Sequence, residues 1–314
     1  MNELLALAIS LSVFVLITYL LSPPSKLYEW LLFSERRLAK LTLRKLDIQE
    51  GQIAYQEGGK GEVLMLLHGF GANKDTWNRI AQHLTPYFHV IAIDLPGFGN
   101  SFKDMQLQYD VQAQVTRLQE IVEGLKLSQF HLAGNSMGGY IAANYAALHP
   151  DKLSSLWLLN PLGVATAPNS EMFEDIAQKK RPVVLANSKL EYKELIARVF
   201  HKAPYMPNFF VDALSLNAIA NFSINKKIFH EIHQTADYQV YFSSPTDLAL
   251  AGFDKPLLIT WGDKDTILHP KGAHALQKVV PSAVVQIIEN VGHLPMIESP
   301  KLTANQFIEF RYPL

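Results

Sequence analysis

The ten residues HLAGNSMGGY (131–140) decide how this chain folds. An apolar run ends at Ala133, and GNSMG (134–138) matches the pattern G-x-S-x-G just before a second apolar stretch. A strand that turns sharply into a helix needs small residues beside the turn, because larger side chains would collide with neighbouring elements. A Gly-rich connection explains the glycines alone, whereas a serine between them predicts that Ser136 is a nucleophile.

A serine hydroxyl is a weak nucleophile unless a base removes its proton and a further group orients that base. We expect the base to be His293, in a loop after the last strand, because Gly292 lets the loop turn and Pro295 prevents a helix from starting at once. His269 and His274 are weaker candidates, since one begins a predicted helix and the other falls inside it.

The acid is expected where the buried run ITWGDKD (259–265) ends in two carboxylates. Asp265 lies farther along the loop and is expected to reach the second ring nitrogen of His293, while Asp263 is expected to stabilise the turn. Asn160 ends an earlier strand, where an alternative acid could sit, but an amide does not compete for this role.

Two backbone amides are needed to stabilise the negative oxygen that forms during attack. One is expected from Met137, directly after the nucleophile, and the other from Phe70 in HGFG (68–71), which follows a buried strand. His68 is interpreted as a packed, hydrogen-bonded residue, and DLPGFGNS (94–101) as a structural loop.

Apolar runs alternate with helical patterns around this centre, which predicts an α/β fold with a mostly parallel sheet covered by helices on both faces. The alternation stops at Pro161 and resumes at about residue 254, so a helical cap is expected at 161–253, inserted into a core of 46–160 and 254–314. The aromatic-rich stretch HKAPYMPNFF (201–210) offers Met206, Phe209 and Phe210 as candidates for an apolar acyl pocket.

The N-terminus differs from the rest, because residues 4–21 contain no charged side chain. As a helix this stretch is about 27 Å long, close to the thickness of a bilayer's hydrocarbon core. A cleaved signal peptide and a buried helix are the alternatives to a transmembrane anchor at 1–22. Lysines and arginines occur only downstream of it, which favours a membrane protein whose bulk lies on the cytoplasmic side.

Residues 23–45 are expected to form an amphipathic juxtamembrane segment. Its apolar face is predicted from helical spacing to contain Leu27, Trp30, Leu31, Leu38 and Leu41. This face would lie either at the membrane surface or against the protein's own core, and the sequence leaves both possibilities open.

Composition removes several other classes of function. The 314 residues have a formal net charge of −1, which gives no reason to expect a nucleic acid partner. No cysteine is present, so thiolate metal sites, disulfides and a cysteine nucleophile are excluded. The 11 histidines are scattered, and we expect neither a metal nor a cofactor.

The ordered motifs HGFG, DLPGFGNS, GNSMGG, GDKD and VGH together resemble those of the α/β-hydrolase fold superfamily over residues 48–312. The resemblance implies Ser136 as nucleophile, Asp265 as acid, His293 as base, and Phe70 and Met137 as oxyanion donors. With the N-terminal apolar stretch, HGFGANKDTW and LLNPLGV are most similar to membrane-anchored monoacylglycerol lipases and related bacterial lipases.

These features predict a membrane-anchored serine ester hydrolase that cleaves lipid esters such as monoacylglycerols. GNSMGG also resembles the carbon–carbon bond hydrolases of aromatic ring-fission pathways, so such a hydrolase or a small-ester carboxylesterase is the alternative. A catalytically silent binding protein on the same fold is the alternative outside enzymes.

Overall fold

The computed structural model of the protein describes residues 5, 7, 22–234 and 238–313. Its centre is one sheet of eight strands in the order β1-β2-β4-β3-β5-β6-β7-β8. The strands are β1 Thr42–Ile48, β2 Gly51–Gly58, β3 Glu62–Leu67, β4 Phe88–Ile93, β5 Phe130–Asn135, β6 Leu153–Leu159, β7 Leu257–Gly262 and β8 Val284–Ile288. β1 and β2 pair antiparallel, β2 joins β4 antiparallel, and every later pairing is parallel.

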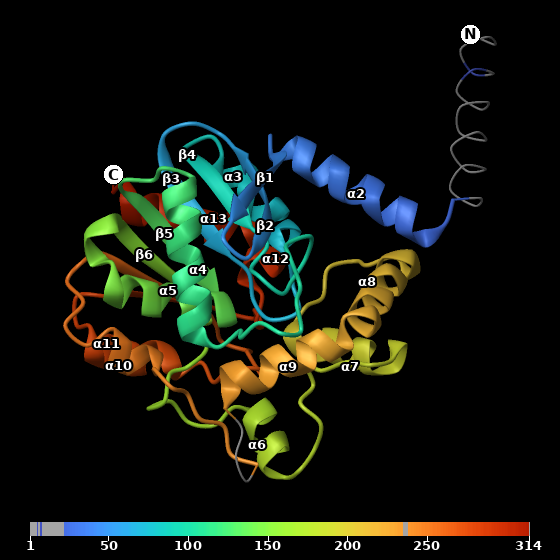
Figure 1. The fold of residues 1–314 in the computed structure, drawn as a ribbon. Helices are drawn as coiled ribbons and strands as arrows, with labels where there is room; N and C mark the ends of the chain where they lie inside the picture. The colour runs from blue at the N-terminus through green and yellow to red at the C-terminus, as the bar shows by residue number, and fades with distance from the viewer. Residues whose placement is uncertain (1–4, 6, 8–21, 235–237, 314) are drawn as a thin grey trace.

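Helices cover both faces of this sheet (Figure 1). The helices that flank the strands are η1 Lys74–Trp77, α3 Asn78–Leu84, α4 Val111–Gly124, α5 Met137–Leu148, η2 Pro150–Lys152, α11 Gly272–Val279, α12 Pro295–Glu298 and α13 Pro300–Arg311. Because the sheet is buried on both faces, successive residues of β3 belong to different cores. Leu64 and Leu66 pack with α3 and α13, whereas Met65 and Leu67 pack with α4 and α5. This explains the continuous apolar runs of the sequence.

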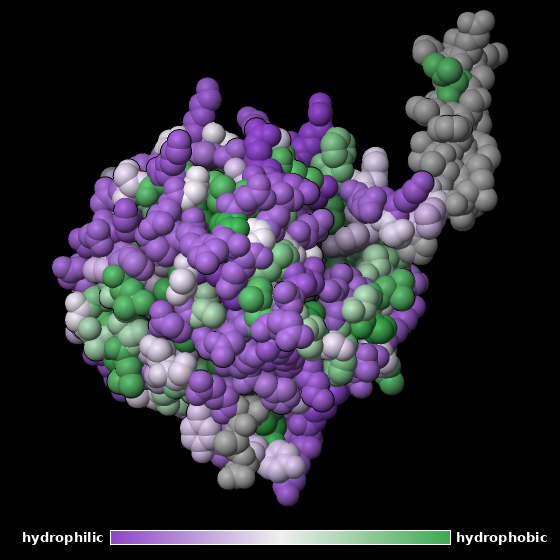
Figure 2. Space-filling model, viewed as in Figure 1, coloured by the Kyte–Doolittle hydropathy of each residue, from purple (hydrophilic) through white to green (hydrophobic). Residues whose placement is uncertain are grey.

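The chain between β6 and β7 forms further helices, which gather at one end of the sheet (Figure 1). They are α6 Glu171–Ala177, α7 Lys189–Val199, α8 Asn208–Ala220, α9 Phe222–His233 and α10 Thr246–Ala249. We call residues 161–253 the cap segment. The surface viewed in Figure 2 is mostly hydrophilic, with apolar atoms gathered on the left side of the view and over α8 on the right. Leu216 of α8 is exposed.

The predicted transmembrane stretch, 4–21, lies outside the described residues except for Leu5 and Leu7. Within the described part of the chain, none of the helices has both the length and the apolar composition needed to cross a membrane. β1 begins at Thr42, inside the segment 23–45 that was predicted to be juxtamembrane.

Helix α2 (Pro24–Leu38) packs on α8 and α3, so this segment is part of the folded domain. The single apolar face predicted for it is wrong in detail. Leu41 is buried, but Trp30 is 69% exposed and Leu38 is 70% exposed. The side facing the domain instead includes Leu32, which is buried, and two charged residues that form ion pairs with the core, Glu35 and Arg36.

Candidate active site

Ser136 occupies the turn between β5 and α5, with φ 54° and ψ −117°. A non-glycine residue at positive φ is strained, and such conformations persist only where the surroundings enforce them. Here the Ser136 N–H donates to the carbonyl of Leu159 at 3.1 Å, and its own carbonyl accepts from the amides of Tyr140 and Leu162, each at 3.0 Å. Three backbone hydrogen bonds therefore hold Ser136 in this conformation.

The two glycines of the motif make room for that turn. A β-carbon on Gly134 would overlap the carbonyl oxygen of Gly138, and one on Gly138 would approach the His68 carbonyl oxygen to 2.6 Å. Both obstacles are backbone atoms, which cannot rotate away as a side chain can. The glycine spacing is therefore a steric requirement of the strand–turn–helix crossing.

His293 and Asp265 meet as the sequence predicted, although 28 residues separate them. The Nδ1 atom of His293 lies 2.8 Å from Oδ2 of Asp265, and both side chains are buried. A carboxylate at Nδ1 fixes the ring orientation and leaves Nε2 free to act as the base. His269 begins the turn before α11, and His274 is exposed on that helix.

Asp265 is held by an unusually complete set of donors. Oδ2 also accepts from Nδ2 of Asn160 at 2.7 Å and from Nε1 of Trp261 at 3.1 Å, while Oδ1 accepts two backbone amides at 2.9 and 3.0 Å. Hydrogen bonds from so many donors fix the position of the carboxylate behind His293. Asn160 was excluded as an acid, and its contribution as a donor was missed. Asp263 instead accepts the Val291 amide at 3.4 Å and stabilises the turn, as expected.

The loop that carries His293 is joined to the cap segment by Glu298, which sequence analysis also missed. Its carboxylate accepts backbone N–H groups of Gly292 at 2.8 Å, His201 at 3.1 Å and Lys202 at 2.8 Å. The His293 N–H itself donates to a carbonyl at the end of α7, at 2.8 Å. Burial raises the pKa of Glu298, although the three amides act in the opposite direction. The cap segment thus holds the backbone of the predicted base directly through Val199, and the preceding Gly292 indirectly through Glu298.

The two predicted oxyanion donors flank Ser136. Met137 is the first residue of α5, so its amide lies at the positive end of that helix. Phe70 follows β3, and its ring contacts those of Phe98 and Phe229 at 5.6 and 5.8 Å between centroids. A β-carbon on Gly69 would lie 3.2 Å from Cβ of Ser136, which places the Phe70 loop directly beside Ser136.

His68 is buried and occupied on both ring nitrogens. Nδ1 donates to the carbonyl of Gly69 at 2.7 Å, and Nε2 accepts the Leu95 N–H at 3.0 Å. Burial lowers the pKa of His68, so the neutral ring is favoured. This geometry matches the structural interpretation made from the sequence.

Ser136, His293, Phe70 and Met137 all line one cavity of about 210 Å³. Its remaining wall is mainly apolar and comes largely from the cap segment, including Leu185, Leu195, Ile196, Phe200, Leu214 and Phe222. Of the predicted acyl-pocket residues, Met206 and Phe210 line it, and Phe209 is not among its lining residues. Tyr28 and Leu32 of α2 also contribute, which the sequence did not predict.

The described residues contain no group of three or more His, Asp or Glu side chains arranged to hold a metal ion. The groups that the cavity presents are the hydroxyl of Ser136, the imidazole of His293 with the buried Asp265 carboxylate behind it, and backbone amides beside the hydroxyl. This arrangement is suited to acyl transfer by a serine nucleophile.

Comparison with known proteins agrees with that chemistry. Residues 62–300 match the family model described as alpha/beta hydrolase fold. "Lipase 3" of Moraxella sp. (strain TA144) is 36% identical over 283 residues, covering 88% of this chain and 87% of that protein. The mouse "Monoacylglycerol lipase ABHD6" is 30% identical over 323 residues, covering 97% and 92%. The crystal structure of a bacterial membrane phospholipase A superposes with a TM-score of 0.87 at 36% identity, covering 99% of this chain and 97% of that one.

Proposed function

This chain belongs to the alpha/beta hydrolase fold family, and we propose that it is a membrane-associated lipase that cleaves lipid carboxylic esters through Ser136, His293 and Asp265. The observation that carries the proposal is the buried His293–Asp265 pair, whose imidazole shares an apolar cavity with a strained serine. A turn with a purely structural role would not require a strained serine, an adjoining apolar cavity and a buried His–Asp pair in one place.

In the proposed reaction, Oγ of Ser136 attacks the ester carbonyl carbon while Nε2 of His293 takes the hydroxyl proton. The amides of Phe70 and Met137 stabilise the negative oxygen of the tetrahedral intermediate. The C–O bond of the ester then breaks, and His293 gives its proton to the departing alcohol. A water, deprotonated by His293, attacks the acyl-enzyme, so that the carboxylic acid leaves and Ser136 regains its proton.

A lipid substrate is supported by the cavity wall, because apolar side chains of the cap segment surround the space next to Ser136. Burying an acyl chain there gains about 0.8 kcal/mol per methylene. The relatives named as lipases point to the same class, and a monoacylglycerol is the specific substrate we propose.

Membrane attachment is part of the proposal. We infer that the uncharged stretch 4–21 anchors the protein, with its bulk on the cytoplasmic side, and that the cap segment and α2 face the bilayer side of the cavity. Trp30 and Phe33 are exposed on α2, the first described helix after that stretch, and aromatic side chains favour the membrane interface.

The test is a substrate panel with the purified full-length protein and its Ser136→Ala variant. The panel contains monoacylglycerols, triacylglycerols, phospholipids, short p-nitrophenyl esters and a vinylogous diketone of the ring-fission type. We expect turnover of monoacylglycerol, covalent labelling by a fluorophosphonate probe, and loss of both in Ser136→Ala. Turnover of the diketone alone would favour carbon–carbon bond cleavage, and absence of Ser136-dependent labelling would favour a silent binding protein.

Anchoring is tested separately by deleting residues 1–22. We expect the shortened protein to leave the membrane fraction while it still hydrolyses a soluble ester. Complete sedimentation with membranes would contradict the anchor and assign binding to the remaining domain.

A further inference from the structure

Helix α2 is joined to the loop that carries the predicted oxyanion donor Phe70. Nη1 of Arg36 donates to Oδ1 of Asp75 at 2.7 Å, and Nε of Arg79 donates to Oε1 of Glu35 at 2.9 Å. The last turn of α2 is therefore joined to Asp75 and Arg79 by two ion pairs.

The Arg36–Asp75 pair is well shielded, since the two side chains are only 15% and 8% exposed. Water screens such an ion pair less than one at the surface. Removing one partner leaves the other charge buried without compensation, which is destabilising. Asp75 also accepts from Nδ2 of Asn78 at 3.3 Å and from Nζ of Lys74 at 3.4 Å. Asp75 is thus the centre of a small network that needs its cationic partners.

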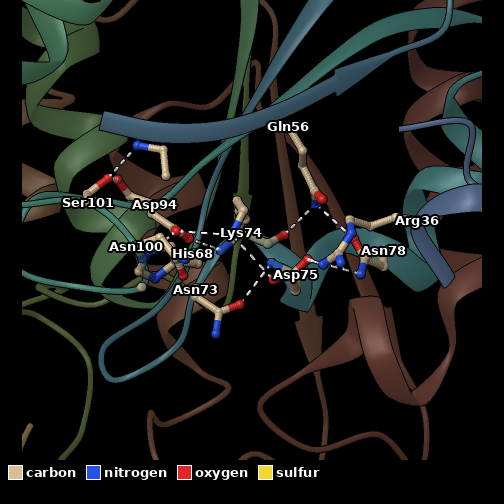
Figure 3. A network of polar contacts seen from close by, with 12 residues as sticks. Arg36, Gln56, His68, Asn73, Lys74, Asp75, Asn78, Asp94, Asn100 and Ser101 are labelled. Carbon is tan, nitrogen blue, oxygen red and sulfur yellow. Dashed lines mark hydrogen bonds and ion pairs between the residues drawn. The ribbon is translucent and has the colours of Figure 1, made fainter. Parts of the chain in front are cut away.

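That network continues to the core on the other side of the loop (Figure 3). The backbone N–H of Lys74 donates to Oδ1 of Asp94 at 2.6 Å, and its Nζ donates to Oδ2 at 3.1 Å. Asp94 follows β4 and is completely buried, and it also accepts the Asn100 amide at 2.8 Å. The turn at 73–75 is therefore held between the fixed end of β4 and Arg36 of α2.

The position of this turn affects the site because it follows Phe70 after only two residues. Gly71 has φ +69°, and a β-carbon there would meet no atom within 4 Å. The backbone just after Phe70 is thus not braced by packing at that residue. The Ala72 N–H donates to the Gly69 carbonyl at 3.3 Å, and the Asn73 side chain accepts the Asp75 N–H at 2.9 Å, so hydrogen bonds connect the backbone around Phe70 to the turn at 73–75.

We propose that Arg36 is a positioning residue for the oxyanion hole: by fixing Asp75, it holds the direction of the Phe70 amide toward the reacting carbonyl. The inference rests on the proposed function. Arg36 is not among the residues that line the cavity, whereas Asp75 is. Its loss is therefore expected to reduce stabilisation of the transition state while the substrate wall stays in place.

The effect should be smaller than loss of an oxyanion donor, which lowers kcat by about 100- to 1,000-fold. The Phe70 ring keeps its contacts with Phe98 and Phe229 when Arg36 is removed, so the loop is loosened rather than released. We expect Arg36→Ala to lower kcat by about tenfold, with KM for a soluble ester changed by less than about twofold.

The experiment uses the full-length protein in detergent with p-nitrophenyl butyrate, so that access to a bilayer does not limit the rate. Arg36→Ala and Arg36→Lys are compared with Arg37→Ala, which removes the same charge from the exposed side of the same helix. Binding of a trifluoromethyl ketone, whose adduct with serine carries a negative oxygen, reports on the oxyanion hole directly. Thermal unfolding identifies the temperature range in which every variant is folded.

We expect the inhibition constant of the ketone to rise about tenfold in Arg36→Ala, in parallel with the fall in kcat. Arg36→Lys should recover part of the loss, and Arg37→Ala should behave as the wild type. Asp75→Asn should reproduce the loss in kcat, and the double variant should add little, because both changes break one interaction.

Normal kcat and ketone binding in folded Arg36→Ala would overturn the inference, as would a loss confined to stability or to KM. The wild type serves as the check on the proposed function. If it shows no Ser136-dependent ester hydrolysis, the proposed function fails; if it is active and Arg36→Ala matches it, only the role of Arg36 fails.

Discussion

Replacing Asp265 by asparagine tests the predicted site most sharply, because the structure gives both the size of the defect and a control in the same loop. The carboxylate accepts five hydrogen bonds, three on Oδ2 and two on Oδ1. An amide has one acceptor oxygen, so its NH2 group must face at least two donors. The least costly orientation keeps oxygen toward His293 and turns NH2 toward the amides of Ile267 and Leu268.

Two hydrogen bonds to a charged acceptor are then lost, each worth about 1.5–3 kcal/mol. We expect Asp265→Asn to lower the free energy of unfolding by about 3–6 kcal/mol, a large part of the roughly 5–15 kcal/mol typical of folded proteins. The base also loses its charged partner, so kcat should fall by about 10,000-fold. Stability is measured by urea unfolding, and kcat with a soluble ester at a temperature where the variant is folded.

Asp263→Asn is the matched control, since Asp263 lies two residues away, is less buried, and has among the contacts of its side chain a long hydrogen bond from the Val291 amide and a partly exposed ion pair with Lys264. We expect its kcat to stay within about tenfold of wild type, because it does not contact His293. A larger loss in Asp263→Asn than in Asp265→Asn would refute the assignment of the acid.

Three further predictions follow from the packing, the hydrogen bonds and the pKa values. Gly134→Ala should destabilise the protein by about 3 kcal/mol or prevent folding, because the new β-carbon overlaps the Gly138 carbonyl; wild-type stability in urea unfolding would contradict this. Glu298→Gln should lower kcat about tenfold by loosening the loop of the base, whereas the exposed Glu309→Gln should not; equal rates would remove Glu298 from positioning. Burial lowers the pKa of His233 to about 4. Between pH 6.5 and 4, His233 is therefore mostly protonated in the unfolded chain and mostly neutral in the folded protein. The free energy of unfolding should therefore fall by about 3 kcal/mol between pH 6.5 and 4, and His233→Asn should show a shallower slope; an equal slope would show that other groups cause the loss.

The local part of the site was predictable from the sequence. The strand and the helix expected on either side of Ser136 are present as β5 and α5. Patterns of this kind depend on neighbours a few residues apart: apolar runs set the strands, and glycine spacing sets the turn at Ser136. His293 and Asp265 were predicted from the loops that contain them, one after the last strand and one at the end of a buried run.

The supporting residues were not predictable, because their roles depend on partners far along the chain. Asn160 donates to a carboxylate 105 residues away, and Glu298 accepts amides of the cap segment almost 100 residues away. Neither type of contact leaves a periodic signal. A polar residue in a loop looks the same in sequence whether it is solvated or satisfied by a buried partner.

Helix α2 shows most clearly the difference between local features that the sequence predicts and contacts that only the tertiary structure reveals. Its sequence predicted an amphipathic segment with Trp30 on an apolar face, at the membrane surface or against the core, and the structure leaves Trp30 exposed. The chain instead turns Arg36 inward, because Asp75 is there to receive it at 2.7 Å. Burying a charge is favourable only when a partner is in place. The sequence by itself therefore determined the tight turn at Ser136 and the alternating strands and helices. The tertiary structure alone decided which polar side chains are buried with a partner and support the candidate site.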